Sequence, residues 1–215
     1  FGCTNLKEVD FTGCHSLNKL GLSCFEEAIS LKELDFSTCE NLQNIQDACF
    51  RKCEKMKVIT FNKDCEISSF PNACFEYCKS LEKINLQDLN KLTTIGDYAF
   101  GHCFSLSNLN INKQALKKIG NFAFVYCSGL KELDFSNSAI ESVGSACFSY
   151  CNNLKKISFK DSKNLKSLSR INLLTNEMNC FFDCVDLRGC DNLERVAYFY
   201  TKEIKASINK VFSAH

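Results

Sequence analysis

Cysteine is the residue type in this sequence best suited to do chemistry, with 16 copies in 215 residues. Most cysteines fall into two regularly spaced rows. One row holds Cys3, Cys53, Cys78, Cys103, Cys127 and Cys151, and the other holds Cys24, Cys49, Cys74 and Cys147. Alanine takes the place of cysteine at positions 28, 99 and 123. Because alanine carries no reactive group, this exchange indicates small buried side chains, and cysteine then acts as a small hydrophobe.

Zinc binding and disulfide bonding are the alternatives for these cysteines. A structural zinc site needs four ligands close together, and the sequence has only His15, His102 and His215 to add to its thiols. Row thiols that recur once or twice in each repeat are spread along the chain and do not converge on such a site, so we expect no metal and no cofactor. Disulfides between neighbouring strands are geometrically conceivable, because paired strands lie ~4.8 Å apart. We nevertheless expect both rows to be reduced.

A smaller group of cysteines lies in the spacers that follow the predicted strands. Its members are Cys14, Cys39, Cys65 and Cys190. Because these positions are outside the two regular rows, we expect them to be the exposed or paired thiols.

Catalytic motifs are absent from the sequence. His102 lies beside Cys103, as a nucleophilic pair would require, but Cys103 belongs to a structural row. Gly96, Gly120 and Gly144 recur at a fixed spacing, which is typical of turns and not of a phosphate-binding loop. There is no His-Glu-x-x-His motif and no nucleophile elbow. We therefore expect a protein that is not an enzyme.

The elements that carry these cysteines belong to an internal repeat. Its clearest copy is IGDYAFGHCFSLSNLNI, residues 95–111. The last apolar residue of each copy falls at Phe11, Phe36, Phe61, Leu86, Ile111, Phe135 and Phe159, so the period is 24 or 25 residues. A fixed period of this length predicts a solenoid, in which each unit buries its apolar side only against its neighbours.

Each repeat contains two kinds of pattern. Leu109 and Ile111 alternate with polar residues, which predicts a half-buried strand. Leu116 and Ile119 predict a second short extended or turn segment that faces the core. Residues that favour helix N-termini follow at Asp47, Asn72, Asp97, Asn121 and Ser145. The segment from there to the next cysteine is predicted to be one or two turns of helix on the convex side.

The phrase IGDYAFGHCFSL, residues 95–106, resembles the leucine-rich repeat superfamily and, more closely, its BspA-like subtype. The resemblance implies an α/β right-handed solenoid, with a parallel sheet on the concave face and short helices or turns on the convex side. It also implies a non-enzymatic protein-binding module, for interaction or adhesion, of a larger surface protein. By the same resemblance we expect a cell-surface or secreted location. The alternative is an intracellular, cytoplasmic scaffold.

The domain organisation follows from the period. We expect a single solenoid over residues 1–215, with regular repeats over about 1–168, an irregular insertion at 169–181, a last repeat at 182–200 and a C-terminal cap at 201–215. The chain begins inside a repeat, so we expect it to be part of a longer array. No apolar run reaches the ~20 residues of a membrane span. The net charge of +1 gives no electrostatic support for a nucleic-acid partner.

A binding face is predicted where polar side chains alternate with the apolar strand positions. The candidate residues are Glu8, Asp10, Glu33, Asp35, Thr60, Asn85, Asn110, Asp134, Ser158 and Asp186. They form one continuous surface in a solenoid, acidic at its N-terminal end. We expect the module to be monomeric and to bind a protein ligand there.

Overall fold

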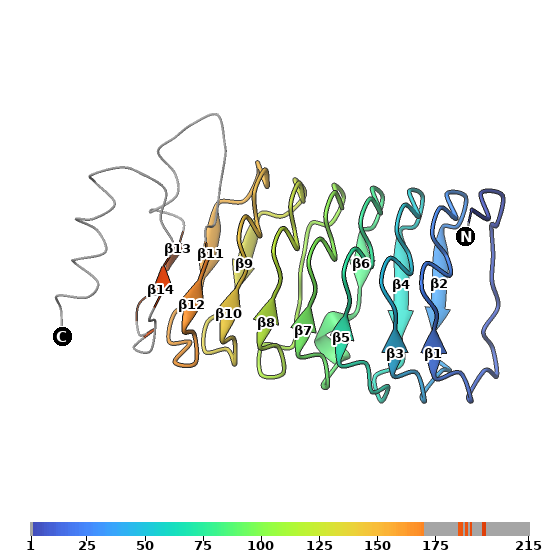
Figure 1. Cartoon of the computed structure of the whole chain (residues 1–215), viewed down its shortest axis with the longest axis horizontal. Coiled ribbons are helices and arrows are strands. Elements are labelled where there is room, and N and C mark those ends of the chain that lie inside the picture. Colours follow the sequence, from blue (N-terminus) through green and yellow to red (C-terminus); the bar gives the residue numbers. More distant parts are fainter. Residues whose placement is uncertain (1, 170–184, 187, 189, 191–194, 197–215) are drawn as a thin grey trace.

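The structure, a computed structural model, describes residues 2–169, 185–186, 188, 190 and 195–196. The chain is a solenoid of parallel strands whose turns stack along one axis (Figure 1). The first row of strands contains β2 (Glu33–Phe36), β4 (Val58–Phe61), β6 (Lys83–Ile84), β9 (Glu132–Asp134), β11 (Lys156–Ser158) and β13 (Val185–Asp186). The second row contains β1 (Lys19–Leu20), β3 (Asn44–Ile45), β5 (Ser69–Phe70), β7 (Thr94–Ile95), β8 (Lys118–Ile119), β10 (Ser142–Val143), β12 (Ser167–Leu168) and β14 (Arg195–Val196).

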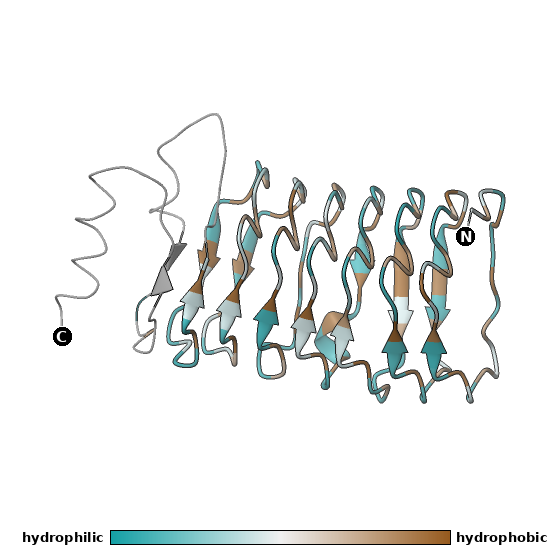
Figure 2. Ribbon diagram, viewed as in Figure 1, coloured by the Kyte–Doolittle hydropathy of each residue, from teal (hydrophilic) through white to brown (hydrophobic). Residues whose placement is uncertain are grey.

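Strand pairing follows the predicted repeat register. Ile59 of β4 lies between Leu34 of β2 and Ile84 of β6. In the later turns Ile157 pairs with Leu133 on one side and with Val185 on the other. Buried and exposed residues alternate along β2, and Figure 2 shows the same change between hydrophobic and hydrophilic colours along the strands. The predicted parallel-strand solenoid is therefore confirmed.

A proline interrupts the second row of strands between β3 and β5. In later turns the residue after the strand donates its N–H to the preceding strand, as Gly96 does to the Phe70 carbonyl oxygen and Gly120 to that of Ile95, both at 2.8 Å. Pro71 takes this position after β5. Because proline has no N–H, the corresponding bond to β3 cannot form, and the ladder stops there.

An asparagine ends the first run of strands after β6. The side-chain Nδ2 of Asn85 donates to the Phe61 carbonyl oxygen at 2.9 Å, and its Oδ1 accepts from the Phe61 N–H at 2.9 Å. The amide thus takes both partners that a continuing strand would use. The chain then forms η1 (Leu86–Asp88), a 3-10 helix and the only helix among the described residues.

The segments that were predicted as short helices are tight turns, so the helix prediction is wrong. Each turn holds two residues with left-handed backbone, such as Tyr98 (φ 55°) and His102 (φ 61°). An α-helix cannot continue through such residues, because all of its residues need negative φ.

Hydrogen bonds between these turns replace the bonds of a helix. The N–H of Phe100 donates to the Ala123 carbonyl oxygen at 2.8 Å, and that of His102 donates to Val125 at 2.7 Å. The same pattern joins earlier turns, since Phe75 donates to Ala99 at 2.7 Å. The tight turns opposite the first row of strands are therefore joined by a third set of backbone hydrogen bonds, which runs along the solenoid.

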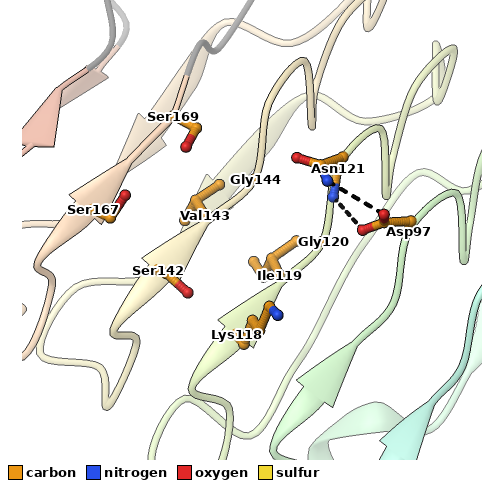
Figure 3. A pocket seen from close by; sticks show the side chains of 10 residues that line it. All are labelled: Asp97, Lys118, Ile119, Gly120, Asn121, Ser142, Val143, Gly144, Ser167 and Ser169. Carbon is orange, nitrogen blue, oxygen red and sulfur yellow. Dashed lines mark hydrogen bonds between the residues drawn. The ribbon is translucent and has the colours of Figure 1, made fainter.

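The predicted helix caps join successive turns instead. Asp97 Oδ1 accepts from the Asn121 N–H at 2.7 Å, and Asp97 Oδ2 accepts from Asn121 Nδ2 at 3.2 Å (Figure 3). Asn72 Oδ1 accepts from the Asp97 N–H at 2.9 Å, and Asn121 Oδ1 accepts from the Ser145 N–H at 2.8 Å. These side chains form a polar ladder along the solenoid. Its members occupy the positions that the sequence predicts to be helix caps.

We expect Asp97→Ala to lower the free energy of unfolding by about 1–2 kcal/mol, because it leaves the Asn121 N–H without its acceptor. Urea denaturation measures this change. Asp97→Asn is the matched control, since Asn72 and Asn121 fill the same ladder with an amide oxygen. A loss of similar size in both variants would show that the bond to Asn121 does not matter.

The core is a continuous stack of phenylalanine rings. Neighbouring rings lie 5.0–5.7 Å apart between centroids and are nearly parallel along Phe25, Phe50, Phe75, Phe100, Phe124 and Phe148. The rings from Phe50 onward are fully buried. The abundance of phenylalanine is therefore structural.

The cysteines of the row that runs from Cys3 to Cys151 lie beside this stack. All of them except Cys3 are buried. Their thiols donate to phenylalanine carbonyl oxygens of the preceding turn, for example Cys78 to Phe50 at 3.1 Å and Cys127 to Phe100 at 3.0 Å. The predicted burial is confirmed for these positions, and each thiol also supplies a hydrogen bond. That they are reduced in solution stays a prediction.

The prediction that the spacer cysteines are exposed is wrong, and their pairing in solution stays a prediction. Cys39, Cys65 and Cys190 are buried and Cys14 is half-buried. The segment after the strand folds back onto the core, and Cys190 Sγ donates to the Phe159 carbonyl oxygen at 2.9 Å. The described cysteines from Cys3 to Cys151 form no disulfide bond in the structure.

The C-terminal divisions of the chain fall largely outside the described residues. The insertion at 169–181 and the cap at 201–215 are not described apart from Ser169. The last repeat at 182–200 is described at residues 185–186, 188, 190 and 195–196. The division of the chain into these segments stays a prediction.

Candidate functional site

The predicted binding residues lie along the first row of strands, on a surface that we call the first-strand face. It comprises the outward side of β2, β4, β6, β9 and β11 together with the equivalent segments at 8–11 and 108–111. Glu33 and Asp35 come from β2 and Asp134 from β9. The exposed candidates are Glu8, Asp10, Glu33, Asp35, Asn110 and Asp134. Period-two alternation thus places these side chains on one surface.

Other candidates are less accessible than predicted. Thr60 and Asn85 are half-buried, and Ser158 is only 8% exposed. Asn85 is occupied by its bonds to the Phe61 backbone. Ser158 lies beneath the turn that follows β11, where its Oγ accepts from the Lys160 N–H at 3.3 Å. Asn85 and Ser158 thus offer less polar surface than the alternation predicts, and their role in a binding face stays a prediction. The side chain of Asp186 lies outside the described residues.

The aspartates of this face also have a structural task. Oδ1 of Asp10, Asp35 and Asp134 accepts from the backbone N–H two residues later, at 2.8, 2.8 and 2.9 Å respectively. This is the Asx-turn, which reverses the chain after each strand. One carboxylate oxygen of each aspartate is therefore used by the turn, and the second oxygen of Asp10 and Asp35 remains for a ligand.

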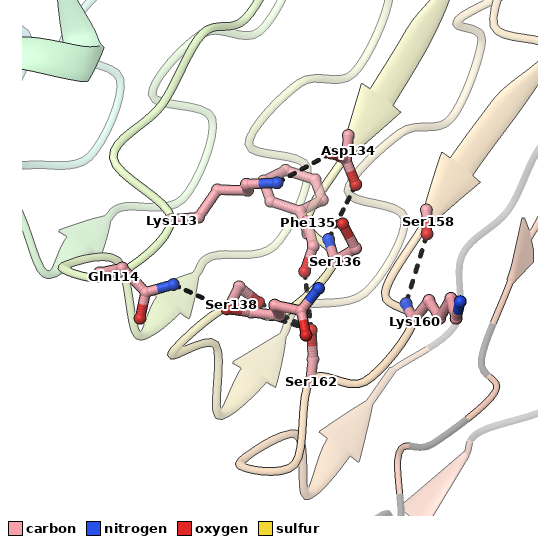
Figure 4. A network of polar contacts seen from close by, with 10 residues as sticks. Lys113, Gln114, Asp134, Phe135, Ser136, Ser138, Ser158, Lys160 and Ser162 are labelled. Atoms are coloured by element: carbon pink, nitrogen blue, oxygen red, sulfur yellow. Dashed lines mark hydrogen bonds and ion pairs between the residues drawn. The ribbon is translucent and has the colours of Figure 1, made fainter.

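The electrostatic environment of these aspartates differs along the face. Lys113 Nζ lies 2.8 Å from Asp134 Oδ2 (Figure 4). Burial by itself raises the pKa of Asp134, but the hydrogen bonds from Lys113 and Ser136 and the charge of Lys113 outweigh it and lower the pKa to about 2. Hydrogen bonds from Thr12 lower the pKa of Asp10. Asp10 and Asp134 are therefore charged at neutral pH.

The N-terminal acidic residues have no counter-ion on this face. Among the described residues, no ion pair involves Glu8, Asp10, Glu33 or Asp35, although many other acidic side chains pair with lysine or arginine of a neighbouring turn. These four residues, which we call the acidic end, lie on two adjacent turns. The adjacent negative charges of the acidic end repel each other. Their combined field attracts a positively charged partner surface.

A shallow depression lies over the second row of strands (Figure 3). It has a volume of about 250 Å³, and its lining includes Lys118, Ser142, Ser167 and the glycines Gly120 and Gly144. A Cβ at either glycine would come within 2.6 Å of the preceding turn. The close stacking of the turns therefore requires glycine at these positions, and the backbone there carries no side chain. The depression is open, and its charged lining side chains are Lys118 and Asp97. Asp97 is engaged by its bonds to Asn121. Within the described residues, no cluster of three metal-ligating side chains occurs.

Sequence reasoning missed a row of aromatic rings on the tight turns opposite the first row. Tyr77, His102, Tyr126 and Tyr150 stack in order, with centroids 4.2, 4.8 and 4.3 Å apart. Phe104 packs edge-on against His102. Tyr126 and Phe104 are 37% and 39% exposed. Burial, followed by the charge of Lys79, lowers the pKa of His102, which keeps the ring neutral at neutral pH. We call this surface the aromatic row.

The aromatic row could have been found from the repeat period. The same slot holds Glu27 and Lys52 in the earlier turns, where these two side chains form an ion pair at 2.7 Å. The change from charged to aromatic residues in this slot is visible in the aligned repeats. Surface aromatic residues at adjacent turns favour protein contact.

The sequence neighbours His102 and Cys103 do not act together. The Cys103 thiol donates to the Phe75 carbonyl oxygen inside the core, whereas the His102 ring stacks at the surface. Burial raises the pKa of buried row cysteines such as Cys78 and Cys127, and it raises that of Cys53 and Cys151 to about 12. A thiol with so high a pKa is a poor nucleophile and metal ligand.

Comparison of the sequence with protein families gives one match. The family described as BspA type Leucine rich repeat region matches residues 1–89 and 66–202, in 6 copies. No curated protein matches the chain. In the described part of the chain, no helix has the length and apolar character needed to cross a membrane.

Three solved structures are similar to the chain. A leucine rich repeat protein of T. pallidum is 18% identical, with 84% of this chain and 77% of that chain covered and a TM-score of 0.49. A leucine-rich repeat protein from Bacteroides ovatus is 17% identical, with 82% and 63% covered and a TM-score of 0.36. A leucine rich cell surface protein from Faecalibacterium prausnitzii is 15% identical, with 97% and 77% covered and a TM-score of 0.39. The chain thus spans less than two thirds of the Bacteroides protein.

Proposed function

Since the chain belongs to the BspA-type leucine-rich repeat family, we propose that it is a non-enzymatic protein-binding module of a larger surface protein. The module binds its partner through the first-strand face. The surface setting is supported by the family, whose members are typically surface or adhesion proteins. An intracellular scaffold is the second candidate, and antibody labelling of intact against permeabilised cells separates the two.

The observation that carries this proposal is the unpaired acidic end of the first-strand face. Glu8, Asp10, Glu33 and Asp35 are exposed on two adjacent turns and lack ion-pair partners in the described residues. The structural need for an Asx-turn accounts for Asp10 and Asp35, but not for Glu8 and Glu33. A basic partner would relieve the repulsion between these carboxylates, which supports electrostatic recognition.

The aromatic row is the competing contact surface within the same function. Its rings supply the large, exposed side chains that dominate protein interfaces, and the first-strand face lacks such side chains. Both surfaces extend over several turns, so a partner could bind either one without a pocket.

The test compares surface variants for binding of the natural partner. The partner is first captured by a photo-crosslinking residue placed at Thr60, and the purified partner is then titrated against each variant. We expect Glu33→Lys with Asp35→Asn to weaken binding by about tenfold or more, because charged contacts are lost or reversed. Asparagine at position 35 keeps the Oδ1 acceptor of the turn to Ser37, so folding is preserved.

The matched control is Lys117→Glu with Lys118→Glu, at exposed lysines beside and on β8 of the second row. This variant should bind normally. Tyr126→Ser with Phe104→Ser tests the aromatic row. If the aromatic variant loses binding and the acidic-end variant does not, the first-strand face is not the site.

A further inference from the structure

Two cysteines of adjacent turns face each other near the N-terminal end of the solenoid. The Sγ atoms of Cys24 and Cys49 lie 3.6 Å apart. Cys24 is exposed and Cys49 is buried. Backbone hydrogen bonds hold the two turns in register on both sides of the pair. The Ser23 N–H donates to the Asp47 carbonyl oxygen at 3.0 Å, and the Phe25 N–H donates to the Cys49 carbonyl oxygen at 2.8 Å.

The buried thiols of the row that runs from Cys3 to Cys151 are arranged differently. Cys53, Cys78 and Cys103 direct their sulfur atoms to phenylalanine carbonyl oxygens at 3.1–3.2 Å. A thiol that donates to a carbonyl is turned away from the next sulfur along its row. Solvent also does not reach these three, since each is fully buried. The Cys24–Cys49 pair thus combines a sulfur–sulfur contact with access for a reagent.

We propose that Cys24 and Cys49 are an oxidation site that a hydroperoxide converts into a disulfide bond between the first two turns. The Cys24 thiolate attacks the O–O bond of the peroxide, forming a sulfenic acid and releasing water after proton uptake. The Cys49 sulfur then attacks Cys24 Sγ, so that the S–S bond forms, the S–O bond breaks and the hydroxide leaves as water with the Cys49 proton. Two thiols and one hydrogen peroxide give one disulfide and two waters.

The order of these steps follows from the pair itself. A hydrogen bond with the Cys49 thiol lowers the pKa of Cys24, although burial opposes it. The hydrogen bond with Cys24, followed by burial, raises the pKa of Cys49 far above its usual range. Cys24 therefore reacts first. Its oxidation removes the hydrogen bond that raises the pKa of Cys49 most, and the Cys49 sulfur then attacks the sulfenic acid as its proton passes to the leaving hydroxide.

The two turns are joined by backbone hydrogen bonds as paired strands are, which favours the bond. Strands paired in a sheet lie about 4.8 Å apart, and disulfides join Cα atoms that are roughly 4.4–6.8 Å apart. Side-chain rotation must shorten the sulfur–sulfur distance from 3.6 Å to about 2.05 Å. The bond would close a loop of one repeat and fasten the turn of Cys24 to the turn of Cys49.

The test treats the purified chain with hydrogen peroxide, blocks free thiols with an alkylating reagent under denaturing conditions and maps the peptides by mass spectrometry. We expect the loss of two free thiols and a Cys24–Cys49 cross-linked peptide that dithiothreitol releases. Cys53, Cys78 and Cys103 should remain alkylated as free thiols. Amide exchange over residues 21–29 should slow by about tenfold or more after oxidation, because the bridge restricts local opening.

Alanine variants provide the controls, and their folding is supported by Ala99 and Ala123, which fill the same row. Cys49→Ala should leave Cys24 as a sulfenic acid that dimedone traps, and Cys24→Ala should leave Cys49 unoxidised. A bridge from Cys24 to Cys3, linked dimers alone, or no oxidation of Cys24 while the chain stays folded would each overturn the proposal. These results do not depend on partner binding, so they are separate from the test of the proposed function.

Discussion

Gly144→Ala is expected to lower the free energy of unfolding by roughly 3 kcal/mol, near the upper end of overpacking costs. A Cβ at Gly144 would lie 2.4 Å from the Gly120 carbonyl carbon and 2.5 Å from the Asn121 nitrogen. Both are backbone atoms of the preceding turn, and they are held by the ladder that joins Gly144 N–H to the Ile119 carbonyl oxygen at 2.8 Å. The clash therefore cannot be relieved by rotation of a side chain.

The matched control is Gly21→Ala, at the same position of an earlier turn. Its Cβ would meet only Gln46 Oε1, at 3.9 Å. Because alanine restricts the unfolded chain more than glycine does, this change should be neutral or stabilising by about 0.4–1 kcal/mol. Urea denaturation of both variants measures the difference. Equal stability changes in the two would show that contact between successive glycines does not limit the stacking of turns.

The strand rows could be predicted from the sequence because their periodicity is simple. Apolar residues repeat every 24 or 25 positions and alternate within each strand, so Leu34, Ile59 and Ile84 had to lie side by side. The tight turns could not be predicted in this way. Tyr98 and Tyr126 have left-handed backbone, although tyrosine is not a residue type that favours it. The turns are held by hydrogen bonds to neighbouring turns, and local sequence does not report such bonds.

The residues of the candidate site could be predicted only in part from the sequence. Alternation correctly exposes Glu33 and Asp35. It fails at Asn85 and Ser158, because their side chains bond to backbone groups of Phe61 and Lys160. It also does not show that Asp35 closes a turn, although an Asp two residues before Ser37 is a usual Asx-turn pattern. Polar residues beside a strand can thus serve the fold and a ligand together.

Phe100→Ala is expected to lower the free energy of unfolding by about 3–5 kcal/mol, the usual cost of a large cavity in a core. The ring is fully buried and lies 5.0 Å from Phe75 and 5.3 Å from Phe124, between centroids. Phe70 packs against it edge-on at 5.9 Å. Its removal breaks the ring stack in the middle, and aromatic pairs contribute about 0.5–1.5 kcal/mol beyond the area that they bury.

Because Phe100 lies in the middle of the ring stack, we expect its removal to reduce the cooperativity of unfolding as well as the stability. In a solenoid each turn contacts only its neighbours, so stability depends on the interfaces between adjacent turns. Phe100→Ala weakens the two interfaces that join the N-terminal and C-terminal halves, and we expect its urea transition to become broader or to separate into two steps. Phe104→Ala is the control, because this ring belongs to the same turn but is 39% exposed; it should cost less than about 1 kcal/mol. If Phe100→Ala retains a single sharp transition and loses no more stability than Phe104→Ala, the ring stack is not what couples the turns.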